Sequence, residues 1–213
     1  MATSLYDELK EAILTGRFEP GQVLSENSLA TEFGKSRTPV REALHRLEIE
    51  TLVERVPRGV RVRASSPEEI LDIYEVRITL EGAAAKAAAE RATELDRTRL
   101  RSAQQAMVVV EDTPQAKAVA NRRFHEAVWA ASHNPTLVDL LQRLNIHLVR
   151  YPTTTLTYGD RWKAVLREHE ELIGAIEARD GEAARRIAEH HMFGAREVRL
   201  RMYAESEHAS NTG

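Results

Sequence analysis

Residues 36–48 read Ser-Arg-Thr-Pro-Val-Arg-Glu-Ala-Leu-His-Arg-Leu-Glu, and this stretch decides the fold of the first part of the chain. Ser36 is a typical helix N-cap, because its hydroxyl can accept a hydrogen bond from a free backbone N–H, and Pro39 is tolerated in the first turn. One face of the expected helix is apolar and consists of Val40, Ala43, Leu44 and Leu47. Arg37 and Arg41 are four residues apart and therefore share a second face. The stretch predicts a short helix with one buried side and one cationic side.

The residues on either side of this helix complete a small domain. Helical patterns precede it at 5–13 and 25–33, and a glycine closes each of them. Two segments of alternating apolar and polar residues follow it, at 52–56 and 60–63, and the Pro-Arg-Gly turn between them predicts a β-hairpin. Three helices and a hairpin within residues 1–64 are the order of a winged helix-turn-helix DNA-binding domain.

The expected cationic helix carries the side chains that read DNA. Its basic and hydroxyl groups at the N-terminal end can reach base edges and phosphates in the major groove, and the hairpin tip can enter the adjacent minor groove. The candidate DNA contacts are Ser36, Arg37, Thr38, Arg41, Arg58 and Gly59. The alternative is an ordinary solvated surface helix. Arginines held in intramolecular salt bridges, or buried, would favour that alternative.

The charge distribution supports a DNA contact even though the chain as a whole is acidic. The net charge is −3, but residues 35–63 contain eight basic and four acidic side chains, a local charge of +4. Local charge governs the approach to a phosphate backbone, whereas the sum over the chain mainly affects solubility.

The bulk composition indicates two small soluble domains. The chain has 213 residues, of which 42% are hydrophobic and 30% charged, and it has no cysteine. The absence of cysteine excludes a disulfide framework and thiolate metal ligands. No signal-like segment and no apolar run of membrane-spanning length are visible. We therefore expect a cytoplasmic protein with no membrane partner.

The second part of the chain is predicted to be an all-α antiparallel helical bundle over residues 66–205. Its start is marked by Ser66-Pro67-Glu68-Glu69, which combines a cap, an N-terminal proline and first-turn acids. The expected helices lie near 67–91, 94–111, 115–132, 136–150, 161–179 and 181–204. Residues 206–213 are expected to form a disordered tail.

Histidines occupy apolar stripes of three of these helices. His125, His169 and His191 each fall on the face that an amphipathic helix buries, and Asn121 lies one turn before His125. His190 is rotated by about 100° from its neighbour, so His191 is preferred as the inward residue. The four side chains Asn121, His125, His169 and His191 could hold one divalent ion, for which imidazole favours zinc or nickel.

Three alternatives compete with a metal-dependent sensor. One is an architectural DNA-binding protein without an effector, which a close-packed second domain with no cavity would favour. Each histidine could be an ordinary core residue with its hydrogen bonds satisfied. The cluster could also activate water in a metal-dependent hydrolase, but that leaves the first 64 residues without a purpose. A general base is also missing, because Glu168 and Glu170 flank His169 and point off its face. We therefore expect that the chain is not an enzyme.

Residues 5–63 resemble the DNA-binding domain of the GntR family of transcriptional regulators. The similar stretches are ILTGRFEPG at 13–21, LSE at 24–26, LA at 29–30, SRTPVREAL at 36–44 and GV at 59–60. The resemblance implies operator contacts from Ser36, Arg37, Thr38, Arg41 and Gly59. The chain departs from the family at Asn27, where many members have arginine, and a contact there would be weaker or differently specific.

Residues from about 70 to 200 resemble the FCD ligand-binding domain of the FadR subfamily. The matching pieces are Arg77 with Glu81, NRRFH at 121–125, Asn134-Pro135, and the segment from His169 through Asp180 to His191. The resemblance implies a homodimer, a pseudo-palindromic operator, a metal ion and a small-molecule effector that is a carboxylate. It also implies a ligand-responsive regulator, with repression as the expected sign. Asn121 stands where many relatives have aspartate, which weakens metal binding. Arg77 is either a clamp for the organic acid or the partner of Glu81.

Overall fold

The computed structural model describes residues 4–64, 66–149 and 154–211. They form two compact units. The first contains the chain up to Ser66 together with the segment that begins at Ile146, and the second contains the rest. The sequence-based division differs in that segment, which it assigned to the second domain.

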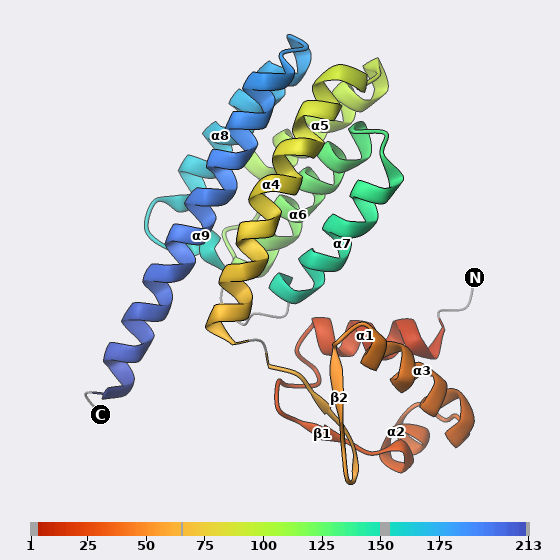
Figure 1. Cartoon of the computed structure of the whole chain (residues 1–213). Helices are drawn as coiled ribbons and strands as arrows, with labels where there is room; N and C mark the ends of the chain where they lie inside the picture. Colours follow the sequence, from red (N-terminus) through yellow and green to blue (C-terminus); the bar gives the residue numbers. More distant parts are fainter. Residues whose placement is uncertain (1–3, 65, 150–153, 212–213) are drawn as a thin grey trace. The chain divides into compact units, whose positions relative to one another are not determined.

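The first unit is a winged helix-turn-helix (Figure 1). Its elements are α1 (Leu5–Leu14), β1 (Val23–Leu24), α2 (Glu26–Glu32), α3 (Arg37–Ile49), β2 (Val53–Val56) and β3 (Gly59–Val62). The predicted hairpin is present as β2 and β3, and β1 adds a third antiparallel strand in the order β1-β3-β2. The strand β1 was not predicted, because two residues are too few to show an alternating pattern.

The apolar face of α3 is the centre of this unit. Val40, Leu44 and Leu47 have no exposed surface, and they pack in one cluster with Leu9 of α1 and Val60 of β3. Because this side of α3 is fully buried, the opposite side is fixed as the outward one. The arrangement confirms the buried and exposed faces that residues 36–48 predicted.

The second unit is all-α, as predicted (Figure 1). Its elements are α4 (Pro67–Arg91), α5 (Glu94–Val108), α6 (Pro114–Ala131), α7 (Pro135–Val149), the short 3₁₀ helix η1 (Thr155–Thr157), α8 (Arg161–Glu177) and α9 (Gly181–Asn211); only the end of α7, from Ile146, is grouped with the first unit. Local sequence sets the helix starts: Thr93 and Thr113 each accept a hydrogen bond from a backbone N–H of the helix that they begin.

Small residues allow α4 and α9 to pack closely along their length. Ala84 and Ala88 of α4 and Ala184 and Ala188 of α9 are buried in the core of this unit. Figure 1 shows the two helices side by side and antiparallel. This pairing brings residues near the middle of α9 over the interior of the bundle, where the histidine of that helix lies.

The expectation of a disordered tail over 206–213 is wrong for residues 206–211, which continue α9 to Asn211. Tyr203 is buried, and the hydroxyl of Ser206 donates to the Tyr203 carbonyl. A helix that is already nucleated adds residues at little cost, so polar composition alone does not end it. Among the residues that the structure describes, none of the helices has the length and apolar character that a membrane crossing needs.

Candidate functional sites

The exposed end of α3 holds four of the predicted DNA contacts. Ser36, Arg37, Thr38 and Arg41 are all exposed. Ser36 has the extended backbone of an N-cap, with φ −73° and ψ 167°, but its hydroxyl makes no capping hydrogen bond. The expected cap bond is therefore wrong, and the helix does not use this hydroxyl.

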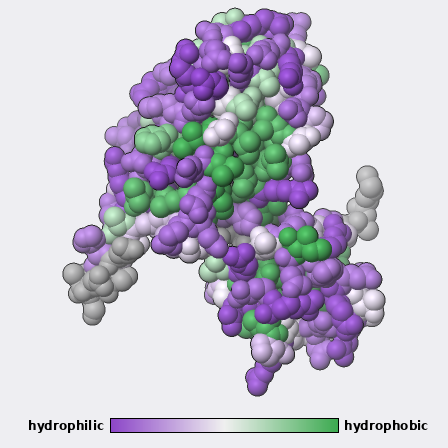
Figure 2. Space-filling view, viewed as in Figure 1, coloured by the Kyte–Doolittle hydropathy of each residue, from purple (hydrophilic) through white to green (hydrophobic). Residues whose placement is uncertain are grey.

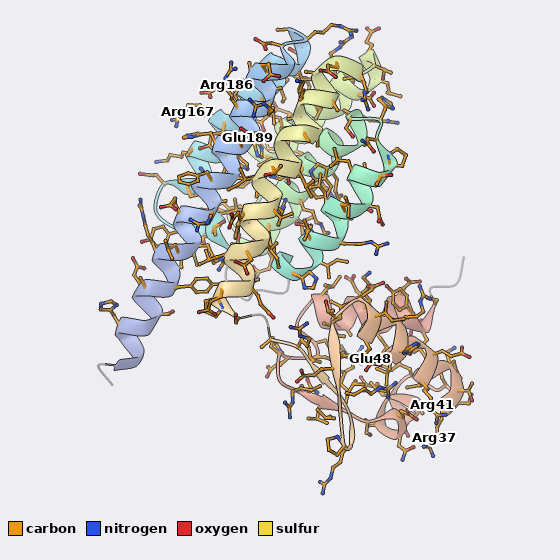
Figure 3. All side chains as sticks on the ribbon, in the orientation of Figure 1. Arg37, Arg41, Glu48, Arg167, Arg186 and Glu189 are labelled. Atoms are coloured by element: carbon orange, nitrogen blue, oxygen red, sulfur yellow. The ribbon has the colours of Figure 1, made fainter. Side chains whose placement is uncertain are left out.

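Both arginines of α3 interact with Glu26 at the start of α2. Arg41 Nη2 lies 3.1 Å from Glu26 Oε2, and Arg37 Nη2 lies 3.8 Å from the same oxygen. The side chains of Arg37 and Arg41 nevertheless remain 63% and 59% exposed, respectively. Figure 3 shows them next to each other at the periphery of the unit. An exposed ion pair contributes little to stability, so a phosphate or a guanine edge can replace Glu26. These salt bridges meet one of the two conditions that favour an ordinary surface helix, whereas the other condition, burial, is not met by either arginine.

The hairpin tip places Arg58 and Gly59 as predicted, but the glycine has a structural reason of its own. Arg58 is exposed and forms no ion pair with any residue in the described part of the chain. Gly59 has φ +137°, and a Cβ atom there would lie 2.2 Å from the carbonyl oxygen of Leu24. Close approach of β1 to β3 therefore requires glycine, whether or not DNA is bound.

Replacing Gly59 by alanine is expected to destabilise the first unit by about 2–4 kcal/mol, because the new Cβ collides with backbone rather than with a side chain that can move. Gly16 is the matched control, since its φ is +78° and a Cβ there meets nothing within 4 Å. Gly16→Ala should cost only the conformational strain of about 1 kcal/mol. Urea denaturation of both variants measures the difference, and equal losses would contradict the collision.

Three helices of the second unit bring their histidines together. His125 on α6, His169 on α8 and His191 on α9 are buried, and each offers a ligand nitrogen within 4.8 Å of the others. His190 is exposed, in agreement with the choice of His191 as the inward residue.

One of the three histidines, His169, and the nearby helix position Asn121 carry buried polar atoms that the described residues do not satisfy. Both ring nitrogens of His169 are buried and have no hydrogen-bond partner in the described chain, and neither does Oδ1 of Asn121. The ring of His169 stacks on Phe124, with centroids 3.8 Å apart and planes 8° from parallel. An unpaired buried polar group is costly. The alternative of ordinary, satisfied core histidines therefore does not describe His169.

A carboxylate holds His191 from the side opposite the cluster. His191 Nδ1 lies 2.6 Å from Glu168 Oε2, and Arg161 Nη1 donates to Glu168 Oε1 over 2.7 Å. Burial raises the pKa of Glu168, but the hydrogen bonds from His191 and Arg161 outweigh it and lower the pKa below the usual value. Glu168 was predicted to point off the face of His169 and was therefore not counted in the site, but it reaches the cluster through His191. Glu170 does point away, to Arg101 on the surface.

A second carboxylate lies beside His125. Glu81 Oε2 is 3.5 Å from His125 Nδ1 and accepts a hydrogen bond from Trp129 Nε1 over 2.7 Å. The other oxygen of Glu81 accepts from Arg77 on the same helix. Burial raises the pKa of Glu81, but attraction to His125 and Arg77 brings it far below its usual range. Arg77 therefore forms the internal ion pair that the sequence left open as an alternative to an effector clamp.

The geometry of the cluster fits a divalent cation. The Nε2 atoms of His125 and His191 face each other at 3.3 Å. Two nitrogens bound to one zinc ion at about 2.0–2.1 Å, in tetrahedral geometry, are about 3.3 Å apart. Burial lowers the pKa of His191 to about 4 and holds the pKa of His169 well below its usual value. Both rings are therefore neutral at pH 7, the form that binds metal.

Sequence reasoning missed Glu168 and Arg161 as members of this site. Arg161 is the first residue of α8 and is buried, a position that normally exposes a charged side chain. The available signal was the spacing of seven residues between Arg161 and Glu168, which places both on one line of a helix. The sequence placed Arg161 and Glu168 on one side of this helix, but it did not show that α9 packs against that side.

Known families match both units. A model described as "Bacterial regulatory proteins, gntR family" matches residues 1–62, and one described as "FCD domain" matches residues 72–194. The chain is 34% identical over 189 residues to the HTH-type transcriptional regulator YdhC of Bacillus subtilis (strain 168), covering 84% of this chain and 82% of YdhC. It is 31% identical over 202 residues to the galactonate operon transcriptional repressor of Escherichia coli (strain K12), covering 84% and 88%.

A solved structure shows the same fold. The structure of E. coli McbR/YncC superimposes with a TM-score of 0.75 at 24% sequence identity, covering 95% of this chain and all of that chain. The relatives named here are transcriptional regulators, which sets aside the hydrolase alternative. The expected resemblance to the FadR subfamily agrees with the FCD match. The chain therefore belongs to the GntR family of bacterial transcriptional regulators, with that family's winged helix-turn-helix followed by an FCD domain, and it is not an enzyme.

Proposed function

We propose that this regulator is a homodimeric repressor that binds operator DNA through α3 and the hairpin and responds to a small organic acid in its helical unit. The observation that carries the proposal is the buried cluster of three histidines, in which His169 has no hydrogen-bond partner within the described residues, in a chain that also presents exposed arginines on α3. A DNA-reading surface alone needs no such cluster. Repression is supported by the relative named for the galactonate operon, which is a repressor.

The helical unit would hold a divalent ion, zinc or nickel, through His125, His169 and His191, with the Oδ1 of Asn121 as a further ligand. When bound, the ion would supply an open coordination position that attracts a carboxylate. The unpartnered Oδ1 atom supports the role of Asn121, which as a neutral ligand would hold the metal less tightly than aspartate does.

The chemistry of the proposed metal site and the similarity to a known relative both favour a carboxylate effector. Galactonate is a sugar acid, and one relative controls the operon named for it. Arg77 is not retained as the effector clamp, because it is buried and its guanidinium is bound to Glu81 and lies 3.4 Å from Asn145 Oδ1. The acid would instead bind at the metal, and the effector would act by preferring one arrangement of the dimer.

Dimerisation is supported by apolar surface on the helical unit. Figure 2 shows hydrophobic residues gathered around α4 in the middle of this unit. Val76 of α4 is 50% exposed and Leu140 of α7 is 45% exposed. Exposed apolar patches of this kind mark interaction surfaces. A dimer would present two copies of α3 to successive major grooves.

Selection of DNA by the full-length protein from a random library tests the DNA half of the proposal. We expect bound fragments to share a pseudo-palindrome with half-sites about one helical turn apart. A selected pool without a common motif, retained no better than the starting library, would contradict it.

The sensor half is tested with the selected fragment, labelled with a fluorophore, and a panel of sugar acids. We expect an acid of this class to release DNA from zinc-loaded protein and to have no effect on protein treated with a chelator. Release that is equal with and without zinc would contradict binding of the acid at the metal.

A further inference from the structure

Two rows of buried side-chain contacts, each within the same polypeptide, reach the histidine cluster. Both rows have the same order of chemical groups. In each, an arginine holds a glutamate, and the glutamate lies at Nδ1 of a histidine. One row consists of Arg161, Glu168 and His191, and the other consists of Arg77, Glu81 and His125. The arginine and the glutamate lie on α8 in the first row and on α4 in the second row.

We propose that Glu168 and Glu81 are positioning residues for the metal ligands, each fixing the imidazole beside it with Nδ1 protonated and Nε2 free. This inference rests on the proposed metal site and assigns a role to residues outside the ligand set. A carboxylate beside Nδ1 accepts a hydrogen bond from the ring N–H there, so the proton stays on Nδ1 and the lone pair is on Nε2.

The position of the two Nε2 atoms follows from this arrangement. With Nδ1 protonated on both rings, as proposed, the Nε2 lone pairs of His125 and His191 would face each other across 3.3 Å. Two lone pairs repel at that distance unless a cation lies between them. His169 adds a third ring whose nitrogens have no partner within the described residues. The carboxylates therefore prepare a site for a cation before one binds.

Stability alone gives a weak reason for these charges. Burying an ion pair removes two ions from water, and the attraction between them often fails to compensate. Arg161 also donates to the carbonyl oxygen of His191 over 2.9 Å, so it fixes the backbone as well as the carboxylate that orients the ring. Each glutamate uses one oxygen for arginine and the other toward histidine. This division of the two oxygens is what an orienting carboxylate requires.

The distance between the glutamate and the histidine differs between the two rows. Glu168 lies 2.6 Å from its histidine, whereas Glu81 lies 3.5 Å away and shares that oxygen with Trp129. His169 is held by its stack on Phe124. We therefore expect Glu168 to control its ligand more strongly than Glu81 does.

Zinc affinity of the full-length protein provides the first test. The metal is removed with a chelator and Zn²⁺ is then titrated against a competing indicator. Loss of a carboxylate beside a metal-bound histidine typically weakens metal binding about 10–100-fold, so Glu168→Gln should raise the zinc Kd by that factor and Glu81→Gln by less. Glu170→Gln is the matched control on α8, because Glu170 pairs with Arg101 on the surface, and its Kd should equal that of the wild type.

The protonation of the ring in the metal-free protein provides a second readout, which a purely structural role would not change. Nitrogen-15 NMR of the histidine side chains should show His191 protonated at Nδ1 in the wild type. In Glu168→Gln the amide can either donate or accept, so a mixture of the two tautomers is expected. Thermal unfolding of the metal-free variants shows whether the fold is retained.

Two results would overturn the inference: zinc affinities of both glutamine variants within twofold of the wild type, or an unchanged His191 tautomer in Glu168→Gln. A wild type that binds no zinc would instead contradict the metal half of the proposed function. In that case the NMR measurement still decides whether Glu168 orients His191, so the two failures are distinguishable.

Discussion

Replacing Arg37 and Arg41 together by alanine is expected to abolish sequence-specific DNA binding and to leave the fold intact. Each bidentate contact of an arginine with guanine contributes about 1–3 kcal/mol of discrimination, so loss of both should weaken binding to the selected fragment by about 100-fold or more. The fold should tolerate the change, because both side chains are exposed and their contact with Glu26 lies on the surface. Fluorescence anisotropy with the selected fragment measures the affinity.

A control with the same change in charge separates recognition from general attraction. Arg167 and Arg186 are exposed on the second unit (Figure 3), and Arg167→Ala with Arg186→Ala removes the same charge from the chain. This variant should bind the fragment as the wild type does. Glu26→Gln should bind at least as tightly as the wild type, because it removes the competing carboxylate. A double variant at Arg37 and Arg41 that binds within threefold of the wild type would rule out α3 as the recognition helix.

The second large effect is expected in the helical unit, where His169→Ala combined with His191→Ala should reduce the bound metal from about one ion per chain to none. Two of three imidazole ligands are then missing, and Asn121 with His125 leaves too few donors for a stable site. Elemental analysis of purified protein measures the stoichiometry, and far-ultraviolet circular dichroism checks that the helices persist.

His190→Ala is the matched control for this measurement. His190 is the neighbour of His191 on α9 but is exposed, so its removal should leave the metal content unchanged. Full stoichiometry in the double variant, or equal loss in the control, would show that the ion is held elsewhere.

Strong local signals fixed most helices in advance. The helix expected at 67–91 is α4 with the same bounds, because a cap, a proline and first-turn acids mark its start. The helix expected at 94–111 ends earlier, at Val108, since no glycine or proline follows directly to mark its end. The strand β1 was missed, because a two-residue strand depends on its partner β3 and carries no periodic pattern.

The candidate site was only partly readable from the sequence. The histidines could be found because each interrupts an apolar stripe. Glu168 was rejected because it is one residue from His169 and therefore lies on another face of α8. That reasoning holds for an isolated helix. In the folded unit α9 covers that face, and its His191 lies against Glu168.

The sequence by itself determined the two domains, the buried face of α3 and the identity of the three inward histidines, because helix periodicity and capping are local properties. Only the tertiary structure decided which polar groups meet. The pairing of Arg41 with Glu26 and of Glu168 with His191 depends on how the helices pack. In the last of these, packing joins side chains 23 residues apart. Contacts between helices follow from shape and burial across the whole core, and no short stretch of sequence specifies them.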